Sequence, residues 1–327
     1  MTTASSSLTL KNRGELWLAG GLKRFYGAFA RPLEPHPPVA QEVYRIPSAP
    51  GVPVRAAPVA PIPRVIWTYW NSDTLPLLIA RCIDNWRRMN PGYEVRVLND
   101  AQVRALIPDA PPVLAQVAPA KRADWIRLAL LHRFGGIWID ASTVLTQSLD
   151  WVIDAQQQAQ SDLVAYYLGR FTTDPACPVV ESWFLAAPPG SRFAADALAE
   201  FDGRAIARSG EEYIECLREQ GVYDLVRQNI DLPSYLSIHL SMQCAMRLRG
   251  GYVLSLTNAE QGPFQYHLLG DWRRTPLKLR LLFSRVQGAA VPPVVKLRGP
   301  DRKRLDEYLA RGLYLPDSLV GRYLMAD

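Results

Sequence analysis

The sequence has few cysteines and no long apolar run, and both absences narrow the possible classes of protein. Its 4 cysteines lie far apart and form no CxxC pair, so zinc ribbons and thiol–disulfide motifs are unsupported and a reducing compartment is the simpler interpretation. No run of about 18 apolar residues predicts a transmembrane helix. The apolar stretch Leu16–Gly21 is too short for the core of a secretory signal. We therefore expect a cytoplasmic protein.

Nucleic-acid-binding motifs and internal repeats are also missing. The net charge of +6 favours an acidic partner, either a phosphorylated ligand or a membrane surface. Because the basic residues are scattered along the chain, we expect no nucleic-acid partner. Hydrophobic residues make up 48% of the chain and charged residues 21%. Such a composition is typical of a globular protein.

The N-terminal part of the chain, up to Pro61, differs in composition from the rest. Residues 1–31 contain LWLAGGLKRFYGAFAR, which predicts a basic amphipathic segment able to lie in a membrane interface. The alternative is a helix that packs on the body of the protein. Residues 32–61 are rich in proline, which predicts an extended arm without regular structure. The globular body should then span residues 62–327, with basic helices near its C-terminus.

Alternating strand and helix patterns open this body. We expect strands at 64–70 and 93–98, helices at 75–89 and 101–107, and then a helix followed by a strand at 137–139. This order implies parallel strands and an α/β nucleotide-binding domain. Beyond residue 150 we expect strands at 163–168, 182–187 and 252–256, with helices at 193–208, 211–229, 235–249, 275–286 and 301–310.

The stretch from residue 121 to 146 carries the residues best suited to chemistry. The strand at 137–139 delivers Asp140 to its end, where α/β sheets place ligand contacts. Ser142 follows two residues later, on the same side of an extended chain. Asp124 and Arg127 are three residues apart and share a helix face. The alternative for this last pair is an ordinary ion pair on a helix surface.

The run RADWIRLALLHRFGGIWID resembles the sugar-binding region of GT-A glycosyltransferases. These include glycosyltransferase family 32, the capsular polysaccharide synthesis proteins and the catalytic domains of clostridial glucosylating toxins. Their pattern is Asp-x-x-Arg on a helix, an apolar run, Gly-Gly, a short strand and Asp-x-Asp (the DXD motif). The resemblance extends to IPRVIWTYWNSDTLP and NWRRMNPGYEVRVLND. It implies an α/β fold of the GT-A type (Rossmann-like, as in nucleotide-diphospho-sugar transferases), with a mainly parallel sheet and added helices.

The resemblance also implies roles for single residues. Trp67 and Tyr69 would flank the nucleotide base, although aromatic residues at this spacing also pack in cores. The catalytic and donor-binding residues would be Asp124, Arg127 and Asp140, which contact ribose, donor sugar or phosphate. Ser142 would complete the donor site, because it stands where the family pattern has its second Asp.

The implied cofactor is a divalent cation, Mn²⁺ or Mg²⁺, which is weakly bound because a hydroxyl is a poorer ligand than a carboxylate. Its predicted ligands are Asp140, Ser142 and His267, the last from a C-terminal loop. A lone histidine is otherwise more often structural. Alternatively, phosphates and another side chain hold the cation, or basic residues neutralise the diphosphate. Glu181 and Asp231 are predicted acceptor-side carboxylates.

The resulting prediction is a glycosyltransferase that works at the inner membrane face as a peripheral protein. It would move a sugar from a nucleotide-sugar donor, with a UDP-sugar as the preferred donor, to a growing bacterial surface glycan of the capsule or lipopolysaccharide type. The acceptor would be a glycan or a lipid-linked glycan, and the resemblance implies retention of configuration. The alternative is a non-catalytic nucleotide- or glycan-binding protein with a degenerate DXD motif.

Overall fold

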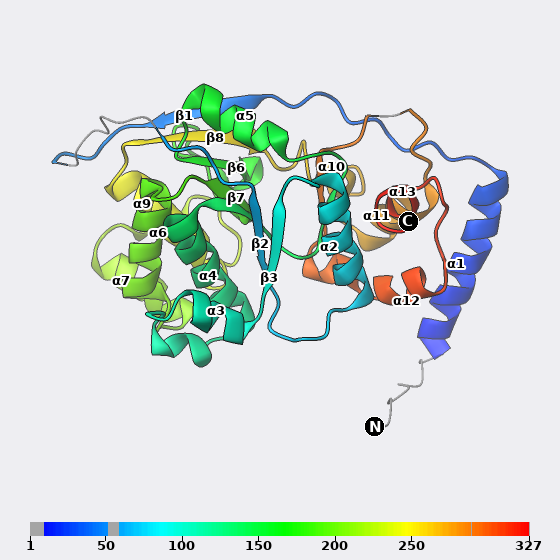
Figure 1. Cartoon of the computed structure of the whole chain (residues 1–327), viewed down its shortest axis with the longest axis horizontal. Helices are drawn as coiled ribbons and strands as arrows, with labels where there is room; N and C mark the ends of the chain where they lie inside the picture. The colour runs from blue at the N-terminus through cyan, green and yellow to red at the C-terminus, as the bar shows by residue number, and fades with distance from the viewer. Residues whose placement is uncertain (1–9, 52–58, 289, 327) are drawn as a thin grey trace.

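The computed structural model describes residues 10–51, 59–288 and 290–326, and it has an α/β fold. Within these ranges a central sheet contains 7 strands (Figure 1). In spatial order they are β1 (Gln41–Ile46), β8 (Tyr252–Asn258), β6 (Leu163–Tyr167), β7 (Val180–Ala187), β4 (Gly136–Ile139), β2 (Val65–Tyr69) and β3 (Glu94–Leu98). Two shorter strands, β5 (Thr143–Leu145) and β9 (Val294–Lys296), pair with each other as a second sheet.

Most strands of the central sheet run in one direction. The pairs β2–β3, β2–β4 and β6–β8 are parallel, whereas β1 and β7 oppose their neighbours. The predicted α/β class and mainly parallel sheet are therefore confirmed. The antiparallel β7 has a direct consequence for function, because its first residues lie beside the carboxyl end of β4. The Asp140 amide donates to the Trp183 carbonyl at 2.9 Å.

Helices surround the central sheet (Figure 1). On one side α4 contacts β2, β4 and β7, and α6 and α9 pack against each other, with α6 also against α4. Elsewhere α5 contacts β6 and β8, and α2 contacts β3 and β5. The helix bounds are α1 (Leu10–Ala28), α2 (Leu77–Met89), α3 (Asp100–Leu106), α4 (Pro119–Phe134), α5 (Asp150–Ala159), α6 (Arg192–Glu200), α7 (Gly210–Glu219), α8 (Tyr223–Arg227), α9 (Ser237–Leu248), α10 (Gln265–Leu268), α11 (Arg274–Phe283), α12 (Leu305–Ala310) and α13 (Leu319–Tyr323).

The proline-rich arm differs from its prediction. Residues 41–46 form the edge strand β1, which pairs with β8 from Gln41 opposite Thr257 to Ile46 opposite Tyr252. This strand lies in a proline-free interval between Pro38 and Pro47, so each of its residues keeps a backbone N–H. The prediction of no regular structure is wrong for this segment, and residues 52–58 lie outside the described ranges.

The N-terminal helix α1 packs on the C-terminal helices instead of standing apart. Leu16 and Ala19 are buried in a hydrophobic cluster that includes residues of α11, α12 and α13. Glu15 accepts from Lys278 at 3.1 Å and pairs with Arg304. This packing matches the body-packed alternative, although residues 1–9 lie outside the described ranges. Among the described residues, no helix combines the length and apolar character needed to cross a membrane.

The Gly-Gly pair after α4 forms a turn that sets the start of β4. Gly135 and Gly136 have φ values of +64° and +106°, which favour glycine. A Cβ on Gly135 would lie 2.5 Å from the Pro189 nitrogen, and a Cβ on Gly136 would lie 2.7 Å from Trp67 Nε1. Because both positions also lack space, the turn holds α4 and β4 close together, with Asp140 at the far end of the strand.

Candidate active site

A cavity of about 1020 Å³ opens at the carboxyl end of β4. The structure brings most of the predicted site residues to its wall, although they come from distant segments. These are Tyr69, Asp124, Arg127, Asp140, Ser142, Glu181 and Asp231. The cavity is large enough for a nucleotide-sized ligand. It therefore defines the candidate active site.

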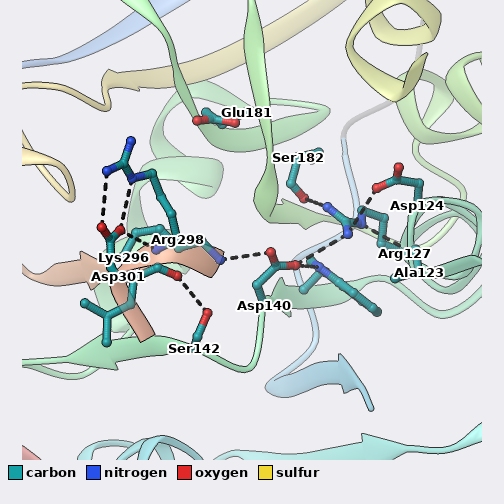
Figure 2. Close-up of polar contacts among 12 residues, drawn as sticks. Ala123, Asp124, Arg127, Asp140, Ser142, Glu181, Ser182, Lys296, Arg298 and Asp301 are labelled. Carbon is teal, nitrogen blue, oxygen red and sulfur yellow. Dashed lines mark hydrogen bonds and ion pairs between the residues drawn. The ribbon is translucent and has the colours of Figure 1, made fainter. Parts of the chain in front are cut away.

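Arg127 joins two carboxylates at the centre of this site (Figure 2). Its Nη2 lies 3.1 Å from Asp124 Oδ1 and 3.4 Å from Asp140 Oδ1. Its Nη1 donates to the Ser182 carbonyl at 2.6 Å, and its Nε donates to the Ala123 carbonyl at 3.2 Å. The Arg127 side chain is only 6% exposed. The pair with Asp124 is therefore part of a buried network, and the alternative of a helix-surface ion pair is wrong.

Asp140 is held as an ionised carboxylate. Its Oδ1 accepts from Trp138 Nε1 at 3.1 Å, and its Oδ2 accepts from Lys296 Nζ at 2.9 Å. Burial alone would raise the pKa of Asp140, but the charges of Lys296 and Arg127 outweigh it and lower this pKa to about 2. Asp140 thus carries a negative charge throughout the physiological pH range.

Asp124 differs electrostatically from Asp140, although both contact the same guanidinium. Burial raises the pKa of Asp124 to about 6, against the opposing charges of Arg127 and His239. Its side chain is 16% exposed. Two carboxylates with such different pKa values beside one arginine are typical of a functional site.

Lys296 reaches Asp140 through the small sheet of β5 and β9. In this antiparallel ladder Thr143 lies opposite Lys296. Next to it, the Leu297 amide donates to the Ser142 carbonyl at 3.1 Å, and the Ser142 hydroxyl donates to the Leu297 carbonyl at 2.8 Å. Burial lowers the pKa of Lys296, and its bond to Asp140 opposes that effect. The turn after β4 thus carries both Asp140 and the anchor for its cationic partner.

The two aromatic residues predicted to flank the base differ in their position relative to the cavity. Trp67 is 2% exposed and does not line the cavity, and its Nε1 donates to the Gly135 carbonyl at 2.8 Å. The indole of Trp67 therefore faces the turn before β4, and its predicted contact with the base stays a prediction. Tyr69 lines the cavity, and its hydroxyl donates to Asp100 Oδ1 at 2.5 Å.

Glu181, one of the two predicted acceptor-side carboxylates, contacts a histidine that was not predicted to belong to the site. His239 Nε2 lies 3.2 Å from Glu181 Oε2, and both side chains are buried at the cavity wall. Asp231 lies on the same wall and is exposed. The sequence placed His239 on a helix but offered no signal for its contact with Glu181, because the two lie on different elements.

Comparisons with known proteins identify the family. Residues 58–269, more than half of the chain, match the family described as "Capsular polysaccharide synthesis protein". The chain belongs to this capsular polysaccharide synthesis family. The resemblance to the capsular polysaccharide synthesis proteins is thereby confirmed, whereas the resemblance to glycosyltransferase family 32 and the DXD motif stay predictions.

Three curated relatives of this family member are fungal. "Glycosyltransferase afumC" of Aspergillus fumigatus is 26% identical over 153 residues, covering 39% of this chain and 37% of the relative. "O-glycosyltransferase PaGT" of Phomopsis amygdali is 28% identical over 139 residues, covering 37% of this chain and 34% of the relative. "Initiation-specific alpha-1,6-mannosyltransferase" of Candida albicans is 25% identical over 137 residues, covering 38% of this chain and 36% of the relative. The chain thus spans little more than a third of each relative.

The solved structures that resemble this chain have lower sequence identity to it than the fungal relatives. The glycosyltransferase GlyE of Streptococcus pneumoniae has a TM-score of 0.40 and 12% identity, covering 78% of this chain and 61% of GlyE. The galactosyltransferase LgtC has a TM-score of 0.36 and 14% identity, covering 72% of this chain and 87% of LgtC. Likenesses of this degree are too loose to assign a substrate or a mechanism.

The predicted metal ligands of this member of the family do not converge. His267 Nε2 lies 2.8 Å from Asp301 Oδ2, where both side chains are buried, and His267 is absent from the cavity wall. Lys296 already occupies one oxygen of Asp140, and the Ser142 hydroxyl is directed at a carbonyl. No group of three or more His, Cys, Asp or Glu side chains suited to a metal occurs among the described residues. The arrangement therefore does not fit the divalent cation that the resemblance implies.

His267 belongs to a buried pair that positions the segment after β9. Asp301, its partner, also accepts from the Arg298 backbone amide at 2.8 Å and from Arg298 Nε at 3.0 Å. The pair therefore fixes the segment after β9, which contributes Arg298 to the cavity beside Lys296. In the sequence this part of the cavity wall is visible as the basic run KLRGPDRKR. Its neighbouring residues do not indicate that it contacts Asp140.

Proposed function

We propose that this protein is a glycosyltransferase that moves a sugar from a nucleotide-sugar donor to a glycan acceptor. The observation that carries the proposal is the buried bridge from Asp124 through Arg127 to Asp140 at the wall of the cavity. Membership of the capsular polysaccharide synthesis family supports it, as do the names of the three fungal relatives.

The network suits recognition of a sugar and a phosphate together. An ionised carboxylate accepts hydrogen bonds from sugar hydroxyls, and Asp124 and Asp140 present carboxylate oxygens on either side of Arg127. The cationic side chains of Lys296 and Arg298 also line the cavity, and they suit the diphosphate. In this assignment the donor lies between the two groups, and Glu181 and Asp231 face the acceptor.

In the transfer step the acceptor oxygen forms a bond to the anomeric carbon. The bond from that carbon to the diphosphate breaks, and its electron pair leaves with the nucleoside diphosphate. We propose retention of configuration, with the acceptor proton passing to the departing phosphate. The anomeric configuration of the product, measured by NMR, tests this: an inverted product would instead assign the proton to a carboxylate such as Glu181.

A panel of UDP- and GDP-sugars tests the proposed activity, with release of nucleoside diphosphate as the readout. We expect turnover with one donor, loss of turnover in a folded Asp140→Asn variant, and no loss in Asp84→Asn. Asp84 is a matched control because it forms a half-exposed pair with Arg87 on α2. Loss of activity in Asp84→Asn alone would contradict the site assignment.

The second candidate is a non-catalytic nucleotide- or glycan-binding protein. The observation that favours it is the serine at position 142, where the Asp-x-Asp pattern of GT-A glycosyltransferases has its second acid. Donors that bind, as seen by thermal shift, without turnover on any acceptor tested would support this candidate. Neither binding nor turnover across the panel would contradict both proposals.

We further propose a UDP-sugar as donor and a bacterial surface glycan, of the capsule or lipopolysaccharide type, as acceptor. The family description supports this acceptor class. A radiolabelled UDP-sugar that labels membrane-extracted, lipid-linked glycan would support the assignment. Label that appears exclusively in protein would refute it.

Helix α1 supports a peripheral contact with an anionic lipid surface, which would place the protein at the inner membrane face. The apolar side chains of Trp17 and Phe25 on α1, and of Phe29 directly after it, are 82%, 53% and 64% exposed. Arg13 and Arg24 are exposed on the same helix, which suits anionic headgroups. Deleting α1 would uncover the hydrophobic cluster beneath it, so point substitutions are the better test.

The double variant Trp17→Ser/Phe25→Ser should weaken co-sedimentation with phosphatidylglycerol-containing vesicles and leave turnover of a soluble acceptor unchanged. The matched control is Leu225→Ser, which changes an apolar residue that is 47% exposed on α8. Equal vesicle binding by the double variant and the unmodified protein would refute the membrane proposal.

A further inference from the structure

The ammonium of Lys296 contacts Asp140 Oδ2, the oxygen that a metal bound on that side of the carboxylate would need. Its Nζ is 2.9 Å from Asp140 Oδ2 and 5.4 Å from the centre of the Trp183 ring (Figure 2 draws the first contact). The Lys296 side chain is 7% exposed. A Mg²⁺ ion binds carboxylate oxygen at about 2.0–2.1 Å, so the ion and the ammonium cannot share this oxygen without strong repulsion.

Ser142 contributes to the same arrangement. Its hydroxyl donates to the Leu297 carbonyl, and its own carbonyl accepts from the Leu297 amide. Two hydrogen bonds therefore hold Ser142 to Leu297, the residue next to Lys296. An aspartate at position 142 would set a carboxylate against that carbonyl with no proton to donate. The residue that departs from the Asp-x-Asp pattern therefore holds the lysine in position.

Two arginines extend this positive wall toward the cavity. Arg298 and Arg302 line the cavity with Lys296, and the Arg298 side chain is 31% exposed. The acid closest to them in sequence is Asp301, which is 1% exposed and pairs with both His267 and Arg298. Because this one carboxylate lies beside two arginines and Lys296, the segment keeps an excess of positive charge at the cavity wall.

We propose that Lys296 performs the task of a divalent cation in this protein. Its ammonium bridges Asp140 and the donor diphosphate, and the segment 298–302, with two arginines and one aspartate, adds a net positive charge. As the anomeric carbon–oxygen bond breaks, the electron pair moves to the β-phosphate, and Lys296 stabilises the charge that develops there. The acceptor proton passes to the same phosphate. Transfer then proceeds without added metal. This inference rests on the proposed glycosyltransferase function.

Binding of UDP and GDP to the full chain tests the inference without requiring turnover. We expect calorimetry to give the same Kd, within about twofold, in EDTA and in Mn²⁺ for the nucleotide that binds. Lys296→Gln should weaken that binding about tenfold or more, because a charged hydrogen bond to phosphate is lost. Lys303→Gln should bind like the unmodified protein, since Lys303 is exposed in the same segment and does not line the cavity.

Turnover of the donor found in the panel distinguishes the proposed role of Lys296 from the proposed glycosyltransferase activity. Persistent turnover in EDTA, with loss in Lys296→Gln and not in Lys303→Gln, supports the role of Lys296. Turnover that requires Mn²⁺ would overturn the inference and leave the glycosyltransferase proposal intact. Absence of nucleotide binding and of turnover, with and without metal, would refute both. The EDTA comparison uses the unmodified protein, so it decides the matter even if Lys296→Gln fails to fold.

Discussion

Replacing Asp124 by asparagine should stabilise the protein at neutral pH while it abolishes transfer. The side chain is buried next to Arg127, and burial raises the pKa of Asp124 to about 6 from its usual 3.8. The charged form is therefore disfavoured in the folded state, even with Arg127 beside it. An asparagine has the same shape, keeps an oxygen for Arg127 and carries no charge. Active sites often retain such costly groups because function requires them.

The magnitude follows from the difference between the two pKa values. In the unfolded chain Asp124 loses its proton near pH 3.8, whereas in the folded protein it keeps that proton to about pH 6. Between these values the folded state binds more protons, so the free energy of unfolding falls as pH rises. A difference of about 2 units corresponds to about 3 kcal/mol at pH 7. Asp124→Asn should recover up to that amount.

Urea unfolding at several pH values between 4 and 7.5 measures this effect. The stability gained in Asp124→Asn should grow with pH across the window and level off above about pH 7. Asp84→Asn, with its half-exposed side chain, should show no comparable gain. A variant that is less stable than the unmodified protein at pH 7, or a gain that does not depend on pH, would refute the reasoning.

Three further substitutions test other parts of the structure. Gly136→Ala should lower the free energy of unfolding by about 3 kcal/mol or more in urea titration, because its φ is positive and the added Cβ meets Trp67. Trp67→Phe should cost about 1 kcal/mol by loss of its bond to the Gly135 carbonyl. It should leave the KM for the donor unchanged, and a raised KM would support the base-binding role. Ser142→Ala should lower the Tm slightly and reduce kcat, since the bond that anchors Leu297 is lost. An unchanged kcat would show that this anchor is dispensable.

Much of the first half of the fold could be predicted from local sequence. The strands β2 and β3 and the helices between and after them lie within a few residues of the predicted ranges. The turn after α4 was visible as Gly-Gly, because two adjacent glycines mark backbone conformations that other residues avoid. Periodicity reports which face of an element is buried, and that information is contained within the element itself.

The later elements show where local patterns fail. The predicted helix at 211–229 divides into α7 and α8 near Gly221, which has a φ of +68°. The predicted helix at 193–208 ends in a π-helical turn at Phe201–Ala205. The strands β1, β5 and β9 were not predicted. Two of these have three residues each, too few for a period to appear, and β1 is masked by the prolines around it.

The sequence by itself determined the acid at the end of β4, the Asp124–Arg127 spacing and the family, because each depends on residues close together in the chain. Only the tertiary structure decided which partners those groups acquire. Lys296 lies 156 residues from Asp140 and reaches it through the β5–β9 ladder. His267 pairs with Asp301 and not with a metal site. Buried polar groups must find partners, and which partner is near enough depends on how distant segments pack.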